Sequence, residues 1–183
     1  MTGPRSSRVL LLPGGQGSGA THWQSRWEAL HGHQRVEQDD WFWPRRGDWM
    51  ARLDEVLLQA SEPAWLVAHS LGCQLVAAWA AHSRHTARVS GALLVAPPDT
   101  ERADTPPQLF NWRPIARQRL PFVSVVVASS NDPFCDTDRA HQMAADWGSE
   151  VVSIGPRGHI NAESSLEDWP QGYALFQQLT ARI

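Results

Sequence analysis

Short apolar runs recur along the chain, separated by polar segments in which apolar residues follow a different spacing. Six runs rich in leucine or β-branched residues are predicted as strands: Arg8–Leu12, around Arg35–Gln38, Ala64–Ala68, Ser90–Val95, Phe122–Ala128 and Glu150–Ile154. The runs that lack alternation of apolar and polar positions are expected to be covered on both faces. Such strands are typical of a parallel sheet.

The segments between these runs carry apolar residues at helical spacing. The clearest stripe consists of Trp49, Leu53, Val56, Leu57 and Ala60, with Asp48 as the predicted N-cap. Further stripes lie at Leu75, Val76 and Trp79, at Ala140, Met143, Ala144 and Trp147 before Gly148, and at Tyr173, Phe176 and Leu179 after Pro170. Alternating strands and helices predict a three-layer α/β fold with a mostly parallel sheet of about six strands. Ligand chemistry is then expected at the carboxyl ends of the strands.

Length and composition limit the class of protein. With 183 residues, 42% of them hydrophobic, and no linker or repeat, the chain is expected to form one domain over residues 1–183. Val9–Leu12 is too short an apolar run for a signal segment or a membrane span, so we expect a cytoplasmic protein without a membrane partner. The net charge is −3 and the sequence has no basic stripe, so nucleic acid is not an expected partner. Cys73 and Cys135 are expected to be buried, reduced thiols.

A polar corner interrupts the apolar pattern at Ser70. The segment Ala68-His69-Ser70-Leu71-Gly72 stands between a predicted strand and a predicted helix, with small residues two before and two after the serine. This spacing resembles the G-x-S-x-G nucleophile elbow, in which a sharp turn exposes the serine Oγ. The alternative is that Ser70 only caps the helix.

A nucleophilic serine needs a base and an orienting acid, in the chain order Ser, Asp or Glu, His. Asp132 directly follows one predicted strand, and His159 follows the last one after a Gly/Pro loop. We therefore predict a catalytic triad of Ser70, Asp132 and His159. Asp136 and Asp138 are alternatives for the acid, but they lie where the next helix begins and are expected to act as capping and dipole residues.

The oxyanion hole is predicted to use two backbone amides. One is that of Leu71, and the other comes from the glycine loop after the first strand, at Gly15 or Gln16. The same loop has an alternative interpretation, because Gly15, Gly17 and Ala20 fit a dinucleotide fingerprint that is followed by Asp39 or Asp40. That interpretation leaves Ser70, Asp132 and His159 without a role. No cofactor is expected, and no metal either, since no carboxylate or cysteine set accompanies His31 and His33.

Several longer blocks resemble the small α/β-hydrolases of the retinoblastoma-binding-protein-nine type, in their bacterial branch. They are "LLPGGQGSGATHWQSRWE", "QDDWFWPRRGDWMARLDE", "VAHSLGC", "GALLVAPPD", "LPFVSVVVASSNDPFC" and "GHINAESSLEDWPQG", which together cover nearly the whole chain. The resemblance implies a minimal, lidless α/β-hydrolase fold, with Ser70 as nucleophile, Asp132 as acid and His159 as base. It implies serine-hydrolase chemistry without fixing the substrate, and some members are linked to protein binding.

The expected reaction is hydrolysis of a small-molecule ester or amide through an acyl-enzyme. Larger hydrolases insert a cap after the strand that ends here at Val95, and only residues 97–121 are available for one. We therefore expect a shallow pocket for short acyl chains. His69, Phe110, Trp112 and Phe134 are the candidate pocket residues, although Phe110 and Trp112 fit equally well as cover for the core. A catalytically silent scaffold that binds a protein is the alternative function, and a homodimer is left open.

Overall fold

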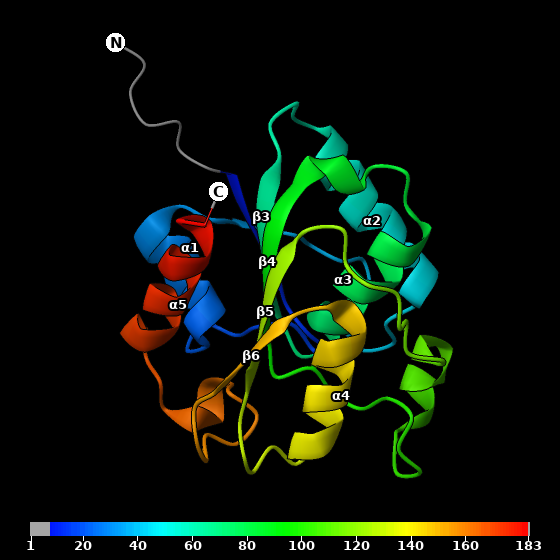
Figure 1. Cartoon of the computed structure of the whole chain (residues 1–183), viewed down its shortest axis with the longest axis vertical. Coiled ribbons are helices and arrows are strands. Elements are labelled where there is room, and N and C mark those ends of the chain that lie inside the picture. The colour runs from blue at the N-terminus through cyan, green and yellow to red at the C-terminus, as the bar shows by residue number, and fades with distance from the viewer. Residues whose placement is uncertain (1–7, 183) are drawn as a thin grey trace.

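The computed structural model describes residues 8–182 and contains a parallel sheet of six strands flanked by helices (Figure 1). The strands are β1 (Arg8–Leu12), β2 (Gln34–Arg35), β3 (Ala64–His69), β4 (Val89–Val95), β5 (Val123–Ala128) and β6 (Glu150–Ser153). The helices are α1 (Trp23–His31), α2 (Arg46–Leu58), α3 (Leu71–His82), α4 (Thr137–Trp147) and α5 (Pro170–Thr180). Short 3₁₀ helices are η1 (Thr86–Arg88), η2 (Pro107–Trp112) and η3 (Ala162–Ser164). The predicted fold class is confirmed.

The sheet order is β2-β1-β3-β4-β5-β6, and every neighbouring pair is parallel. From β1 the chain first adds β2 at one edge, and then places β3 on the opposite side of β1. The strand order therefore reverses between β1 and β3. In open α/β sheets, ligands bind outside the carboxyl ends of the strands at such a switch point, and the loops that follow β1 and β3 lie there.

Two apolar cores cover the two faces of the sheet. In Figure 1, α1 and α5 lie on one side, and α2, α3 and α4 lie on the other. Side chains of β1 alternate between the cores, with Leu10 and Leu12 in one and Val9 and Leu11 in the other. Both faces are thus buried, which is why the strands show apolar runs rather than alternation.

Most of the ten tryptophans are core residues. Eight have at most 5% of their surface exposed: Trp23, Trp27, Trp49, Trp65, Trp79, Trp112, Trp147 and Trp169. Trp43, in contrast, is 54% exposed. The large rings therefore fill both layers between helices and sheet, and they contribute much of the buried apolar area that stabilises the fold.

The predicted N-cap of α2 is wrong. The helix begins at Arg46 with Arg45 at the cap position, and Asp48 lies in the first turn. The amide of Arg46 instead donates to the side-chain oxygen of Asn111, 2.6 Å away. Because this cap comes from a residue distant in the sequence, the local pattern could not indicate where the helix starts. The other predicted boundaries agree better: Gly148 ends α4 in the left-handed conformation with φ 69°, and Pro170 begins α5.

The second predicted strand is displaced. The pattern suggested residues around Arg35–Gln38, whereas β2 covers only Gln34–Arg35 at the edge of the sheet. A two-residue edge strand carries little periodic signal, which explains the error. Between β4 and β5, the segment of residues 97–121 contains the short helix η2 and no inserted cap domain. The cover over the carboxyl edge of the sheet is therefore small.

Candidate active site

Ser70 occupies a sharp turn between β3 and α3. Its backbone has φ 54° and ψ −123°, a conformation that is strained for a residue with a Cβ. The amide of Ser70 donates to the carbonyl oxygen of Val95, 2.9 Å away, and the Ser70 carbonyl accepts from the amide of Cys73 at 2.8 Å. The turn is thereby fixed against β4 and the first turn of α3. Strain of this kind, held by surrounding hydrogen bonds, is characteristic of a nucleophile elbow.

Two glycines allow the backbone to approach this turn closely. A Cβ at Gly72 would overlap the carbonyl oxygen of Leu12 in β1, so α3 can contact the sheet only because position 72 lacks a side chain. A Cβ at Gly14 would lie 2.8 Å from the Cβ of Ser70. The elbow spacing predicted the small residue at position 72. The need for a glycine at position 14 was missed, because it depends on how the β1 loop meets the elbow.

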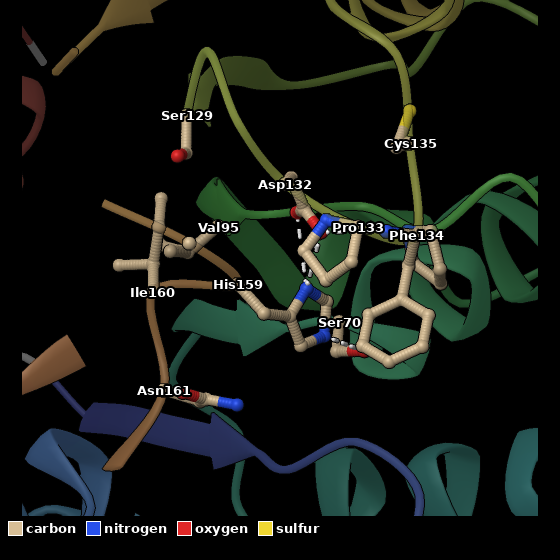
Figure 2. Close-up of polar contacts among 12 residues, drawn as sticks. Ser70, Val95, Ser129, Asp132, Pro133, Phe134, Cys135, His159, Ile160 and Asn161 are labelled. Atoms are coloured by element: carbon tan, nitrogen blue, oxygen red, sulfur yellow. Dashed lines mark hydrogen bonds and ion pairs between the residues drawn. The ribbon is translucent and has the colours of Figure 1, made fainter. Parts of the chain in front are cut away.

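The structure brings Ser70, His159 and Asp132 together (Figure 2). His159 Nε2 lies 2.8 Å from Ser70 Oγ, and His159 Nδ1 lies 3.0 Å from each carboxylate oxygen of Asp132. Only 9% of the His159 side chain and 4% of the Asp132 side chain are exposed. The hydrogen-bond network assigns the proton of the neutral ring to Nδ1, which donates to Asp132, and leaves Nε2 to accept from the Ser70 hydroxyl.

Asp132, rather than Asp136 or Asp138, is the acid that reaches His159. Its Oδ1 also accepts from the amide of Phe134 at 2.9 Å, which fixes the orientation of the carboxylate. Asp136 occupies the N-cap position of α4 and Asp138 lies in the first turn, where negative charge is favourable. The Asp136 side chain makes no capping hydrogen bond. Both residues therefore lie at the start of α4, as predicted, but the Asp136 side chain does not cap the helix.

Two polar residues after β5 anchor the loop that carries His159. The Asn131 side-chain oxygen accepts from the amide of Gly158 at 2.7 Å and from Ser129 Oγ at 3.0 Å. Ser129 Oγ in turn accepts from the amide of Arg157 at 2.9 Å. Sequence reasoning missed both residues, although "SSN" directly before Asp132 is a polar cluster at a strand end. Their role follows only from the approach of the β6 loop.

The candidate oxyanion donors lie on both sides of the switch point. Leu71 is the first residue of α3, and the first amides of a helix have no intrahelical acceptor. Gln16, in contrast, donates its amide to the carbonyl oxygen of Trp41 at 2.8 Å. That amide is already used, so Gln16 is not available as the second donor. Gly15 is left as the candidate, and its amide has no backbone acceptor in the part of the chain that the structure describes.

A hollow beside Ser70, hereafter the Ser70 hollow, has a volume of about 310 Å³. Its apolar wall includes Trp41, Phe42, Leu71, Pro98, Leu109 and Phe134. Phe134 is thus the one pocket candidate from the sequence that lines it. Its ring stands edge-on to that of His159, with 4.7 Å between the centroids.

Three other pocket candidates lie elsewhere. Trp112 is only 1% exposed, and its indole donates to the carbonyl oxygen of Pro44, so it belongs to the core. Phe110 is half-exposed and lies against the guanidinium of Arg113, outside the Ser70 hollow. His69 is buried behind the site, with Nε2 2.9 Å from the carbonyl oxygen of His159.

Burial sets the charge of the groups behind the site. It lowers the pKa of His22 to about 3, and the charges of Arg35 and His159 act in the same direction. Burial also holds the pKa of His69 well below its ordinary value, with His22 and His159 contributing. Both rings are therefore neutral near pH 7.

Cys73 and Cys135 are buried, as expected. Burial raises the pKa of Cys135 to about 12, and it raises the pKa of Cys73 well above the ordinary range. These thiols are poor nucleophiles.

The dinucleotide interpretation of the glycine loop does not agree with the structure. The loop is followed by α1, which begins only at Trp23, and its Gly14 lies against Ser70. Of the two candidate ribose-binding acids, Asp39 pairs with Arg52, and Asp40 accepts from the amides of residues 42 and 43.

Among the described residues there is no cluster of three or more histidine, cysteine or acidic side chains that could hold a metal ion. None of the described helices combines the length and the apolar character needed to cross a membrane.

Comparisons with known proteins agree with this geometry. Residues 9–178 match the family described as Serine hydrolase. None of the curated protein sequences is significantly similar to the chain. Among solved structures, a protein described as a YdeN-like hydrolase from Pectobacterium atrosepticum is 29% identical, with a TM-score of 0.84 over 95% of this chain and 90% of that one.

Two more distant structures share the fold. The ydeN gene product of Bacillus subtilis is 19% identical, with a TM-score of 0.73 over 96% of this chain and 100% of that one. A monoacylglycerol lipase from Paleococcus ferrophilus is 11% identical, with a TM-score of 0.72 over 98% and 96% of the two chains. The family match covers nearly the whole chain, and the elbow, the sheet order and the fold agree with it. This chain therefore belongs to the serine hydrolase family and has the α/β-hydrolase fold.

Proposed function

We propose that this protein hydrolyses a small ester or amide through a Ser-His-Asp triad and an acyl-enzyme formed on Ser70. The observation that carries the proposal is the unbroken hydrogen-bonded row from the Asp132 carboxylate through the ring of His159 to Ser70 Oγ. A serine hydroxyl is a weak nucleophile without an adjacent base, and an imidazole needs a fixed tautomer to serve as that base. This row supplies both.

In the acylation step, Ser70 Oγ attacks the substrate carbonyl carbon while its proton moves to His159 Nε2. Asp132 stabilises the imidazolium that forms and does not itself take the proton. The carbonyl oxygen becomes an oxyanion, which the amides of Leu71 and Gly15 stabilise by hydrogen bonds. His159 then gives the proton to the leaving alcohol or amine, and the acyl group remains on Ser70.

In the deacylation step, water takes the place of the leaving group. His159 accepts a proton from this water as it attacks the acyl carbon, and it returns that proton to Ser70 Oγ when the acid leaves. No cofactor or metal is required for any of these steps. Residues 97–121 form only a small cover over the site, and this supports short acyl chains as substrates. We also propose that the chain belongs to the retinoblastoma-binding-protein-nine branch of the family, and the resemblance of its sequence blocks to that branch supports this.

Activity-based labelling tests the proposal directly. A fluorophosphonate probe is expected to label the wild-type protein and Ser61→Ala, which removes an exposed serine far from the site. Labelling should be lost in Ser70→Ala and strongly reduced in His159→Ala. Labelling that survives in Ser70→Ala would point to another nucleophile. A folded wild-type protein that is not labelled, and that turns over no p-nitrophenyl ester, would favour the binding-scaffold alternative.

A further inference from the structure

The Ser70 hollow contains no fixed charge. Its apolar wall includes Trp41, Phe42 and Leu109, and its polar side chains besides Ser70 and His159 are the neutral amides of Gln16, Gln108 and Asn161. Among the described residues, no aspartate, glutamate, arginine or lysine lines it. A charged acyl group would lose its hydration there without gaining a partner, which is unfavourable. An uncharged acyl chain, in contrast, would gain apolar contacts.

Phe134 lies at the boundary between this hollow and two others. One neighbour, of about 130 Å³, shares Pro98, Pro106 and Leu109 with the Ser70 hollow. The other, of about 460 Å³, shares His159 and Asn161 with the Ser70 hollow. Phe134 lines all three. Phe134 therefore lies where the three hollows meet and forms part of the wall of the Ser70 hollow, whose volume is about 310 Å³.

The backbone of Phe134 is fixed on both sides, so this wall has a defined position. Its amide donates to Asp132 Oδ1 at 2.9 Å, and its carbonyl oxygen accepts from the amide of Asp99 at 2.9 Å. The ring itself stands edge-on to that of His159 (Figure 2), and it lines the same hollow as Ser70. Because the bond to Asp132 comes from the backbone, replacing the side chain leaves that partner of the triad in place.

We infer that the Ser70 hollow accepts an uncharged acyl chain and that Phe134 determines how long this chain can be. The inference rests on the proposed function, since it assigns the acyl side of the same site. Without the Phe134 ring, the hollow would open into its two neighbours and admit a longer chain. With a larger ring, it would admit only a shorter one.

A series of p-nitrophenyl esters with a constant leaving group tests the length. In Phe134→Ala, the ratio of kcat/KM for the octanoate to that for the butyrate is expected to rise about tenfold over wild type, since one or two methylene contacts are sufficient for such a change. Phe134→Trp should lower the same ratio. Phe110→Ala is the matched control, because Phe110 is also about half-exposed but lines none of the three hollows, and it should keep the wild-type ratio.

A charged ester tests the second half of the inference. p-Nitrophenyl hemisuccinate matches the butyrate in chain length but carries a carboxylate, and its kcat/KM in wild type should be lower by about tenfold or more. All variants are first labelled with the fluorophosphonate probe. Labelled Phe134 variants with the wild-type length profile, or a hemisuccinate turned over as well as the butyrate, would overturn the inference. A wild-type protein that is not labelled at all would instead refute the proposed function on which it rests.

Discussion

The ring of His69, which directly precedes Ser70, lies with Nε2 2.9 Å from the backbone carbonyl oxygen of His159. Since His69 is buried and its pKa is held well below the ordinary value by burial, its ring is neutral and Nε2–H donates to this carbonyl. The residue next to the elbow serine thus holds the loop of the histidine. One side of this contact is fixed by β3 and the other by the loop after β6.

This contact predicts a positioning role for His69. In His69→Leu, the His159 carbonyl would be buried without its donor, which costs about 1–3 kcal/mol in the free energy of unfolding. A looser His159 should also lower kcat for p-nitrophenyl butyrate more than it changes KM. His69→Gln, whose amide can donate to the same carbonyl, should recover part of kcat. Equal kcat in wild type and both variants would show that the contact does not position His159.

Replacing the proposed triad acid, Asp132, should lower kcat without changing the fold. Asp132→Asn keeps a side-chain oxygen for the Phe134 amide, but it can no longer fix the His159 tautomer or stabilise the imidazolium. We expect kcat to fall by about 10³–10⁴ with an unchanged circular dichroism spectrum. Asp136→Asn is the matched control, because that residue lies at the start of α4 and should keep wild-type turnover. Comparable losses in the two variants would contradict the assignment of the acid.

The contact between α3 and β1 predicts a large stability difference between two glycine substitutions. Gly72→Ala would force its Cβ onto the carbonyl oxygen of Leu12, so the free energy of unfolding should fall by about 1–3 kcal/mol or more. Gly47→Ala lies in α2, where no other atom is near its Cβ, and should be neutral or stabilising by up to about 1 kcal/mol. Urea denaturation of the two variants measures the difference. Similar midpoints would show that α3 does not approach β1 this closely.

The buried His22 predicts a loss of stability on mild acidification. Its pKa falls from an ordinary 6.5 to about 3 in the folded protein, so between these values the unfolded chain binds a proton that the folded one does not. The contribution is fully present above pH 6.5 and falls by about 1.4 kcal/mol per pH unit below it. From pH 6.5 to 5, His22 alone therefore accounts for about 2 kcal/mol.

His22→Asn isolates this contribution. His22 Nδ1 accepts from the amide of Gln24 at 3.1 Å as the N-cap of α1, and an asparagine oxygen can serve the same cap. The substitution also removes a buried ring nitrogen, Nε2, that has no partner among the described residues. His33, whose pKa is also lowered, remains in both proteins, so its contribution cancels in the comparison. The pKa of His69 should be lowered less in the variant, because His22 is one cause of that shift, and this change acts in the same direction. Urea denaturation should show a smaller loss of stability between pH 6.5 and 5 in the variant than in wild type. An equal loss in the two proteins would show that a group other than His22 takes up the proton on unfolding.

The local pattern determined the fold class and the order of the elements. Strands buried on both faces must be apolar throughout, so β1, β3, β4 and β5 were visible as runs, and the parallel sheet followed from their alternation with helices. The same logic placed the three candidate triad residues, because the carboxyl ends of parallel strands meet at one edge. Together with the chain order Ser, Asp, His, these positions selected Asp132 and His159 from the other acids and histidines.

Only the tertiary structure decided the features that depend on contacts between distant segments. The cap of α2 comes from Asn111, the amide of Gln16 is used by Trp41, and Trp112 belongs to the core rather than to the pocket. Periodicity reports which face of an element is buried, but not which residue of another loop comes to lie against it. The anchoring of the His159 loop and the boundary position of Phe134 are set by such approaches between segments, so only the folded chain could show them.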